Sequence, residues 1–160
     1  MVEGWLGRPR GTVPARHDLR AQGECVIIRG HGENCRRSVR EPGVSGPSSG
    51  ARALRLHLVL IPPGTRGEPH FHSGGETAVY VVSGEADVWH GASLGQRSAV
   101  RAGDFVYIPP GTPHLAVNQG DVTSIVVVAR TDPADRPGAV AIELPAHLTA
   151  LLSYPVAVDE

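Results

Sequence analysis

The apolar residues of this chain fall in short runs that alternate with polar positions, mainly after residue 53. The run 53–61 alternates most clearly: its four leucines lie on one face of an extended strand, and Arg55, His57 and Val59 lie on the other. The turn sequence Pro62-Pro63-Gly64 ends this run. The pattern therefore predicts a strand that has one apolar face and one mixed face.

Further short runs follow, each ended by turn residues. They are TAVYVVS (77–83), EADVWH (85–90), a run near 96–100, DFVYI (104–108), HLAVN (114–118) and TSIVVVAR (123–130). Short strands at regular spacing with Gly/Pro punctuation favour a β-sandwich or closed barrel over alternating β/α units. The sequence has no internal repeat, which indicates one barrel. A helix is predicted only at 145–152, where a proline suits the first turn and Leu148, Leu151 and Leu152 share a face.

The chain divides into three predicted parts. Residues 1–52 form an N-terminal arm, a short strand (CVIIR, 25–29) and a Gly/Ser/Pro-rich loop, 30–50, that is either a lid or mobile. Residues 53–145 form the barrel, and residues 146–160 form the C-terminal helix and tail.

Composition excludes several classes of function. The 160 residues suit one domain, and a net charge of −1 argues against non-specific nucleic-acid binding. All 15 basic residues are arginine, so neither a Schiff base nor a lysine general base is available. Cys25 and Cys35 fit neither a CxxC redox motif nor a paired zinc spacing. With no signal-peptide pattern and no apolar run of about 20 residues, we expect a soluble, cytoplasmic protein that does not bind membranes.

Candidate metal ligands cluster in two segments. His70 and His72 are two residues apart, a spacing that points both side chains to one face of an extended strand, where both reach one ion. Ser73-Gly74-Gly75 then supplies a turn, and Glu76 follows closely enough to add a carboxylate. In the second segment, Pro109-Pro110-Gly111 delivers His114 to the start of a strand.

Other residues are candidates for contact with a substrate. Arg55, His57, Tyr80 and Asn118 are the predicted substrate residues, and His57 and Glu76 are the candidate proton carriers. Structural alternatives remain open for each of three side chains. His57 fits a hydrogen-bonded barrel histidine, Tyr80 fits barrel filling, and Asn118 fits a group that holds backbone or orients a ligand.

The two segments resemble the paired motifs of the cupin superfamily, G(X)5HXH(X)3–4E(X)6G and G(X)5PXG(X)2H(X)3N. The second motif matches at Gly103, Pro109, Gly111, His114 and Asn118, and the first at Gly64, His70, His72, Glu76 and Gly84. One spacing departs, because seven residues rather than six separate Glu76 from Gly84, so that Thr77 lies where six would place the acid. No other carboxylate lies nearby, and we therefore predict Glu76 as the fourth ligand.

The resemblance, closest to small bacterial single-domain cupins, implies an all-β jelly-roll barrel, a homodimer, and one divalent metal inside the mouth. Three imidazoles and one carboxylate with open coordination positions suit Fe(II), Mn(II) or Ni(II), while Zn(II), Co(II) and Cu(II) remain possible.

The predicted function is a metal-dependent enzyme that acts on a small organic molecule. A dioxygenase-type oxidoreductase ranks first, and an isomerase, epimerase or decarboxylase ranks second. A non-catalytic metabolite-binding module is the alternative from a different class. If Glu76 is not a ligand, the site becomes a three-histidine centre, and the ranking moves further toward oxygen chemistry.

Overall fold

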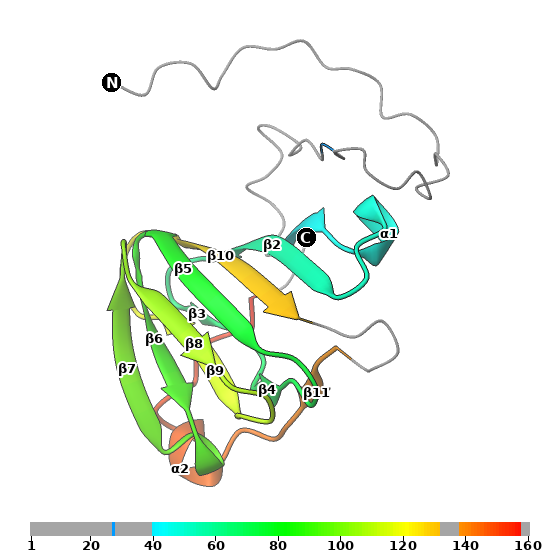
Figure 1. Ribbon diagram of the computed structural model, residues 1–160. Helices are drawn as coiled ribbons and strands as arrows, with labels where there is room; N and C mark the ends of the chain where they lie inside the picture. Colours follow the sequence, from blue (N-terminus) through cyan, green and yellow to red (C-terminus); the bar gives the residue numbers. More distant parts are fainter. Residues whose placement is uncertain (1–26, 28–39, 132–137, 158–160) are drawn as a thin grey trace.

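The chain folds into two antiparallel β-sheets that face each other, as a computed structural model describes for residues 27, 40–131 and 138–157 (Figure 1). The first sheet has the order β1 (Arg40–Val44), β2 (Leu54–Ile61), β10 (Ser124–Thr131), β5 (Thr77–Ser83) and β8 (Phe105–Ile108). The second has the order β11 (Val140–Ala141), β4 (His70–Phe71), β9 (His114–Asn118), β6 (Glu85–His90) and β7 (Gln96–Arg101), with β3 (Thr65–Arg66) paired to β9.

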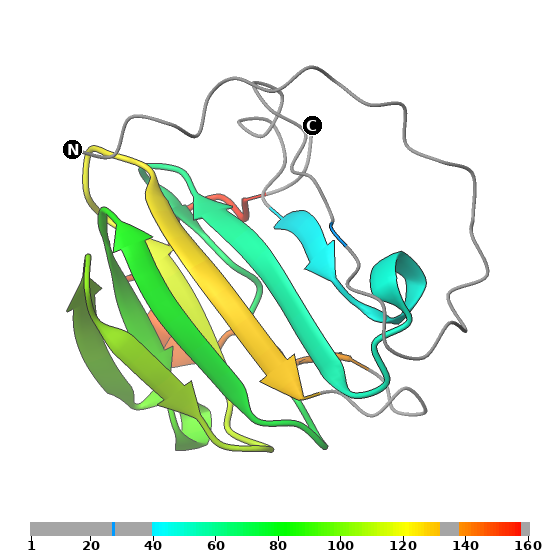
Figure 2. The same cartoon turned by 45° about the horizontal axis from the view of Figure 1, so that its top comes forward.

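Strands that are distant in sequence lie side by side in both sheets. β2 pairs with β10, and β10 pairs in turn with β5, so the centre of the first sheet depends on long-range contacts. Figure 2 shows this sheet as a broad twisted layer with the second sheet behind it. The predicted all-β jelly roll is confirmed, and the strands predicted after residue 53 appear close to their expected bounds.

Alternation along the first sheet separates an inner face from an outer one. On β5, Thr77, Val79 and Val81 face the space between the sheets, whereas Tyr80 and Val82 face outward and are 39% and 47% exposed. The inner residues of β2 and β10 meet them in register, since Val126 pairs with both Val59 and Val81. The inner faces of three strands therefore line a common space.

A separate core lies on the far side of the second sheet. Leu115 and Val117 of β9 pack there with Leu94, from the short 3-10 helix η2 (Ala92–Leu94), and with Leu148 and Leu152. Leu148 belongs to α2 (Ala146–Thr149), which is shorter than predicted. Leu151, predicted to share the buried face, is 55% exposed because the helix ends before it.

Only the end of the predicted N-terminal part can be compared with the structure. The expected arm (1–24) lies outside the described residues, as does the predicted strand 25–29 apart from Ile27, which is in no regular element. Part of the predicted loop 30–50 is ordered: β1 pairs with the edge of β2, and α1 (Gly46–Ser49) follows, capped by Ser45. The sequence of β1 shows no apolar alternation, so no strand was predicted there. Its backbone hydrogen-bond partners come instead from long-range pairing with β2. Among the described residues no helix is long and apolar enough to cross a membrane.

Candidate functional site

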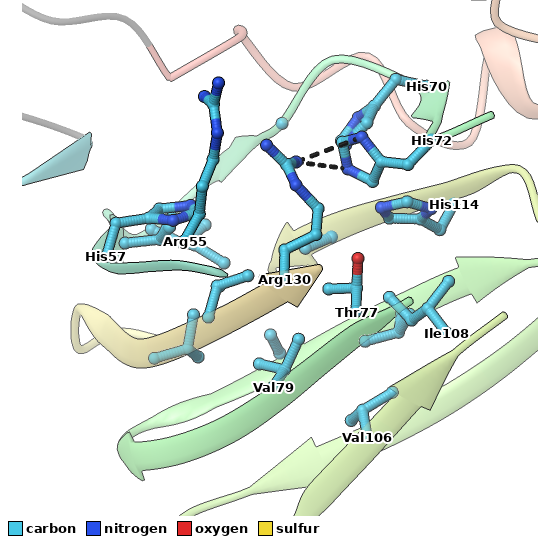
Figure 3. Close-up of a pocket in the computed structure, with 18 of the residues that line it drawn as sticks. Arg55, His57, His70, His72, Thr77, Val79, Val106, Ile108, His114 and Arg130 are labelled. Atoms are coloured by element: carbon cyan, nitrogen blue, oxygen red, sulfur yellow. Dashed lines mark hydrogen bonds between the residues drawn. The ribbon is translucent and has the colours of Figure 1, made fainter. Parts of the chain in front are cut away.

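Three histidines converge at one end of the space between the sheets (Figure 3). His70 of β4 pairs directly with His114 of β9, and His72 follows β4 by one residue. Each offers one ring nitrogen, and the three ligand atoms lie within 4.8 Å of one another. The i, i+2 spacing and the Pro-Pro-Gly turn therefore bring together the histidines that the sequence singled out.

Backbone carbonyls orient all three rings. The Nδ1 atoms of His70, His72 and His114 lie 2.7, 2.6 and 2.9 Å from the carbonyl oxygens of Glu68, Gly138 and Thr112. A proton on each Nδ1 donates to its carbonyl and leaves the lone pair on Nε2. Metal-binding histidines are held in this way, so these residues fit a divalent transition metal.

The protonation state of His114 also fits a metal site. Burial lowers its pKa from 6.5 to about 4, against the opposing effect of the Thr112 carbonyl. The charges of His70, His72 and Arg130 lower the pKa further. His114 is therefore neutral at pH 7, which is the form that coordinates a metal ion.

Glu76, predicted as the fourth ligand, lies apart from this group of three histidines in the structure. Its side chain is exposed, and its Oε1 accepts a hydrogen bond of 2.7 Å from the hydroxyl of Tyr107. The pKa of Tyr107 is raised, mainly because of this hydrogen bond. Strand alternation instead turns Thr77 inward, where it is 4% exposed and lines the cavity. In the sequence, the seven residues between Glu76 and Gly84, one more than in the cupin motif, were the signal that Thr77 rather than Glu76 occupies the inward position.

A cavity of about 590 Å³ extends from the histidines between the sheets. Its walls are mainly small aliphatic side chains: Val59, Ile61, Val79, Val81, Ala86, Val88, Val100, Val106, Ile108, Ala116, Val126 and Val128. The volume lies in the range of about 300–1,000 Å³ that holds small-molecule ligands in proteins. The cavity therefore offers an apolar chamber beside a polar, histidine-rich end.

Basic side chains other than the histidine cluster also line this cavity. Arg55 and His57 of β2 do so, in agreement with the face of β2 on which the sequence placed them. Arg130 of β10 pairs in register with Arg55. Its Nη1 donates to Nε2 of His72 over 2.8 Å, so the lone pair of His72 that would bind a metal accepts from Arg130 in this structure. Sequence reasoning missed Arg130, although a charged residue at an inward position of an apolar strand was a usable signal.

Two predicted substrate residues lie elsewhere. Tyr80 is on the outer face of the first sheet, where its ring packs on Phe105 with centroids 4.7 Å apart. Asn118 is fully buried beyond the cavity lining, and its side chain bonds the backbone of Ile61, Val122 and Gly120. Neither residue therefore lines the cavity in this structure. Asn118 takes the backbone-holding role that the sequence had left open.

The fold and the site together define a class, a two-sheet antiparallel barrel with a histidine cluster at one end of its cavity. The family model for the cupin domain matches residues 57–129, which contain all three histidines. The polyketide synthase CurC of Streptomyces cyaneus is 30% identical over 126 residues, which cover 78% of this chain and 77% of that protein. The chain belongs to the cupin superfamily.

Solved structures agree with the fold. A Klebsiella pneumoniae protein with a double-stranded β-helix domain matches with 27% identity and a TM-score of 0.52, covering 58% of this chain and 77% of that one. A Cupin 2 conserved barrel domain protein from Salinispora arenicola matches with 22% identity and a TM-score of 0.57, covering 69% and 92%. At that identity the second likeness shows the fold alone.

Proposed function

We propose that this protein is a metal-dependent enzyme that acts on a small organic molecule, with the metal held by His70, His72 and His114. The observation that carries the proposal is the convergence of three imidazoles, each oriented by a carbonyl at its Nδ1. Three protein ligands leave coordination positions for a substrate, unlike a closed structural site.

A dioxygenase-type oxidoreductase is the chemistry we favour. A divalent transition metal in such a site supplies Lewis acidity and a place for dioxygen beside the substrate. Three neutral ligands leave the full charge of the ion to attract an anionic oxygen atom. An isomerase or epimerase needs a group that removes and returns a proton, and His57 is the cavity residue suited to that task. Decarboxylation remains a further candidate.

The chain's own residues would hold the substrate and keep water out. The aliphatic walls provide apolar contact area, and the low polarity of the chamber strengthens every charge interaction at its histidine end. The likeness to a protein named as a polyketide synthase supports a substrate of the polyketide type. Such carbon skeletons combine apolar bodies with oxygen groups that a metal and arginines bind.

We also propose a homodimer. The outer face of the first sheet carries exposed apolar side chains on the two adjacent strands β5 and β8, among them Val82, Phe105 and Tyr107 at 47%, 79% and 60% exposure. A contiguous apolar face of this kind suits a self-complementary interface with a second copy. Light scattering at micromolar concentration should give the dimer mass, and Phe105→Ser should shift the equilibrium toward the monomer. A monomeric wild-type protein would refute the dimer.

The metal assignment is tested by elemental analysis of protein purified without added metal. We expect wild-type protein to carry a stoichiometric transition metal, and the double variant His70→Ala/His114→Ala to lose it. His147→Ala is the matched control, because His147 is exposed on α2 outside the cavity. Metal retained at the wild-type level in the double variant would overturn the assignment.

The oxygen chemistry is tested on the metal-loaded protein. Oxygen uptake is measured with catechols, diketones and small thiols, and the double variant serves as the blank. Uptake that depends on the histidines would support the oxidoreductase. Substrate turnover without oxygen consumption would favour the isomerase or decarboxylase instead.

A further inference from the structure

We propose that Arg130 competes with a divalent metal ion for Nε2 of His72, and that the hydroxyl of Thr77 accepts the guanidinium when the metal binds. Arg130 is then a positioning residue, which sets the metal affinity of the histidine cluster without itself binding the ion. The inference rests on the metal site of the proposed function, but it concerns metal binding alone and holds whichever reaction the protein catalyses.

The Arg130 guanidinium lies against the ring of His72. Its Nη1 is 2.8 Å from Nε2 and 3.1 Å from Nδ1, contacts that the dashed lines of Figure 3 mark. Nδ1 also lies 2.6 Å from the carbonyl oxygen of Gly138, to which it donates its proton. The lone pair that accepts from Arg130 is therefore the one on Nε2. Because a guanidinium is not deprotonated in proteins, Arg130 is a permanent donor at this position.

A metal ion and Arg130 cannot use Nε2 of His72 at the same time. A divalent transition metal binds an imidazole nitrogen at about 2.0–2.1 Å, along the same lone pair that accepts from Nη1. The ion and Nη1 would overlap there, and both carry positive charge. The charge of Arg130 also acts on the rest of the cluster, because it adds to the effect of burial, the main cause that lowers the pKa of His114. Metal binding therefore requires the guanidinium to leave His72.

Thr77 offers an acceptor beside Arg130. The two residues are register partners on the adjacent strands β5 and β10, and both line the cavity. Such partners have Cβ atoms about 4.5–5.5 Å apart, within reach of a long side chain. Oγ1 of Thr77 is buried and has no hydrogen-bond partner among the described residues, and Figure 3 shows it directed toward the histidine end. Since a buried hydroxyl without a partner is unfavourable, a guanidinium that moved to Thr77 would regain part of what it lost at His72.

The competition predicts opposite effects for the two residues. The bond from Arg130 to His72 has a charged donor and so belongs to the stronger class of hydrogen bonds. A metal must break this bond, so removal of Arg130 should raise the metal affinity of the cluster. Removal of the Thr77 hydroxyl should lower the metal affinity, but only while Arg130 is present. An ordinary structural role would give a weaker site in both cases.

Calorimetric titration of Zn(II) into the chelator-treated full chain tests the competition. Zn(II) binding that persists in His70→Ala/His114→Ala is subtracted, because it occurs outside the cluster. We expect Arg130→Leu to bind Zn(II) about tenfold more tightly than wild type. Arg101→Leu should leave the affinity unchanged, because Arg101 is exposed on β7 outside the cavity.

Arg130→Met is a second variant that removes the donors, and thermal unfolding identifies any variant that fails to fold. Wild-type or weaker Zn(II) affinity in the folded Arg130 variants would overturn the proposal. A crystal structure of the zinc-bound protein provides a direct view. We expect Nη1 of Arg130 to have left Nε2 of His72 for Oγ1 of Thr77, and zinc bound by the other two histidines with Arg130 still on His72 would overturn the competition.

A double-mutant cycle tests the role of Thr77. Thr77→Val keeps the shape of the side chain and removes its hydroxyl. It should weaken Zn(II) binding about threefold in the wild-type background and leave the affinity of Arg130→Leu unchanged. Thr77→Ser keeps the hydroxyl and should bind Zn(II) as wild type does. An equal loss in both backgrounds would show that Thr77 acts on the metal itself, and no loss in either would show no role; both results would overturn its assignment as acceptor.

The outcomes separate this proposal from the proposed function. Zn(II) binding of equal strength in wild type and Arg130→Leu would refute the competition and leave the enzyme proposal intact. Binding confined to the Arg130 variants would support the competition while refuting a resident metal in the wild-type protein. Binding by neither protein would overturn both proposals.

Discussion

Replacing Asn118 by alanine should destabilise the fold without emptying the metal site. The Asn118 side chain is fully buried, and its Nδ2 donates to the carbonyls of Ile61 and Val122 over 2.7 and 2.8 Å. Its Oδ1 accepts from the backbone N–H of Gly120 over 2.9 Å. These bonds join the end of β2 to the turn between β9 and β10.

The expected loss follows from the bonds removed. A hydrogen bond contributes about 0.5–1.5 kcal/mol net, and buried groups left without a partner cost more, so three lost bonds give about 2–4 kcal/mol. Asn118→Asp should be at least as destabilising, because it removes both donors and brings a carboxylate toward two carbonyl oxygens.

Urea unfolding followed by circular dichroism measures the free energy of unfolding. We expect the midpoint to fall while the slope stays constant, and metal content per folded chain to stay at the wild-type level. Gln119→Ala is the matched control, since its side chain is exposed. A destabilisation of Asn118→Ala below about 0.5 kcal/mol, combined with lost substrate binding, would show that Asn118 contacts substrate and refute this reasoning.

Three further changes test the site and the fold. Glu76→Gln should keep wild-type metal affinity by calorimetry, because the carboxylate bonds Tyr107 outside the cluster, and a tenfold loss would restore Glu76 as a ligand. The pKa of His114 is lowered to about 4 in the folded protein, so the unfolded state binds more protons below pH 6.5. Metal-free protein should therefore lose up to about 3 kcal/mol of stability as the pH falls from 6.5 toward 4. Urea midpoints that stay constant across that range would contradict this. Gly84→Ala should lower the unfolding temperature, since Gly84 has φ +74° and a Cβ there would lie 2.8 Å from Cα of Ser124; an unchanged temperature would exclude the strain.

Local sequence signals determined much of this protein. Period-two alternation and Gly/Pro turns predicted the strands and the barrel, because strand periodicity and turn chemistry depend on neighbouring residues. The i, i+2 pair His70 and His72 needed only an extended backbone to share a face. The turn before His114 likewise fixed where its strand begins, and the two motifs together indicated that these histidines meet.

Only the tertiary structure decided which face of each strand turns inward. Alternation divides β2 into two faces, yet the face with Arg55 and His57 lines the cavity, while Leu54 on the leucine face is 50% exposed. The same choice at the start of β5 placed Thr77 inside, and Glu76, the residue before the strand, is exposed. The pairing of Arg55 with Arg130 depends on the register of strands far apart in the chain. Such registers arise from packing both sheets around one cavity, which no local pattern of residues specifies.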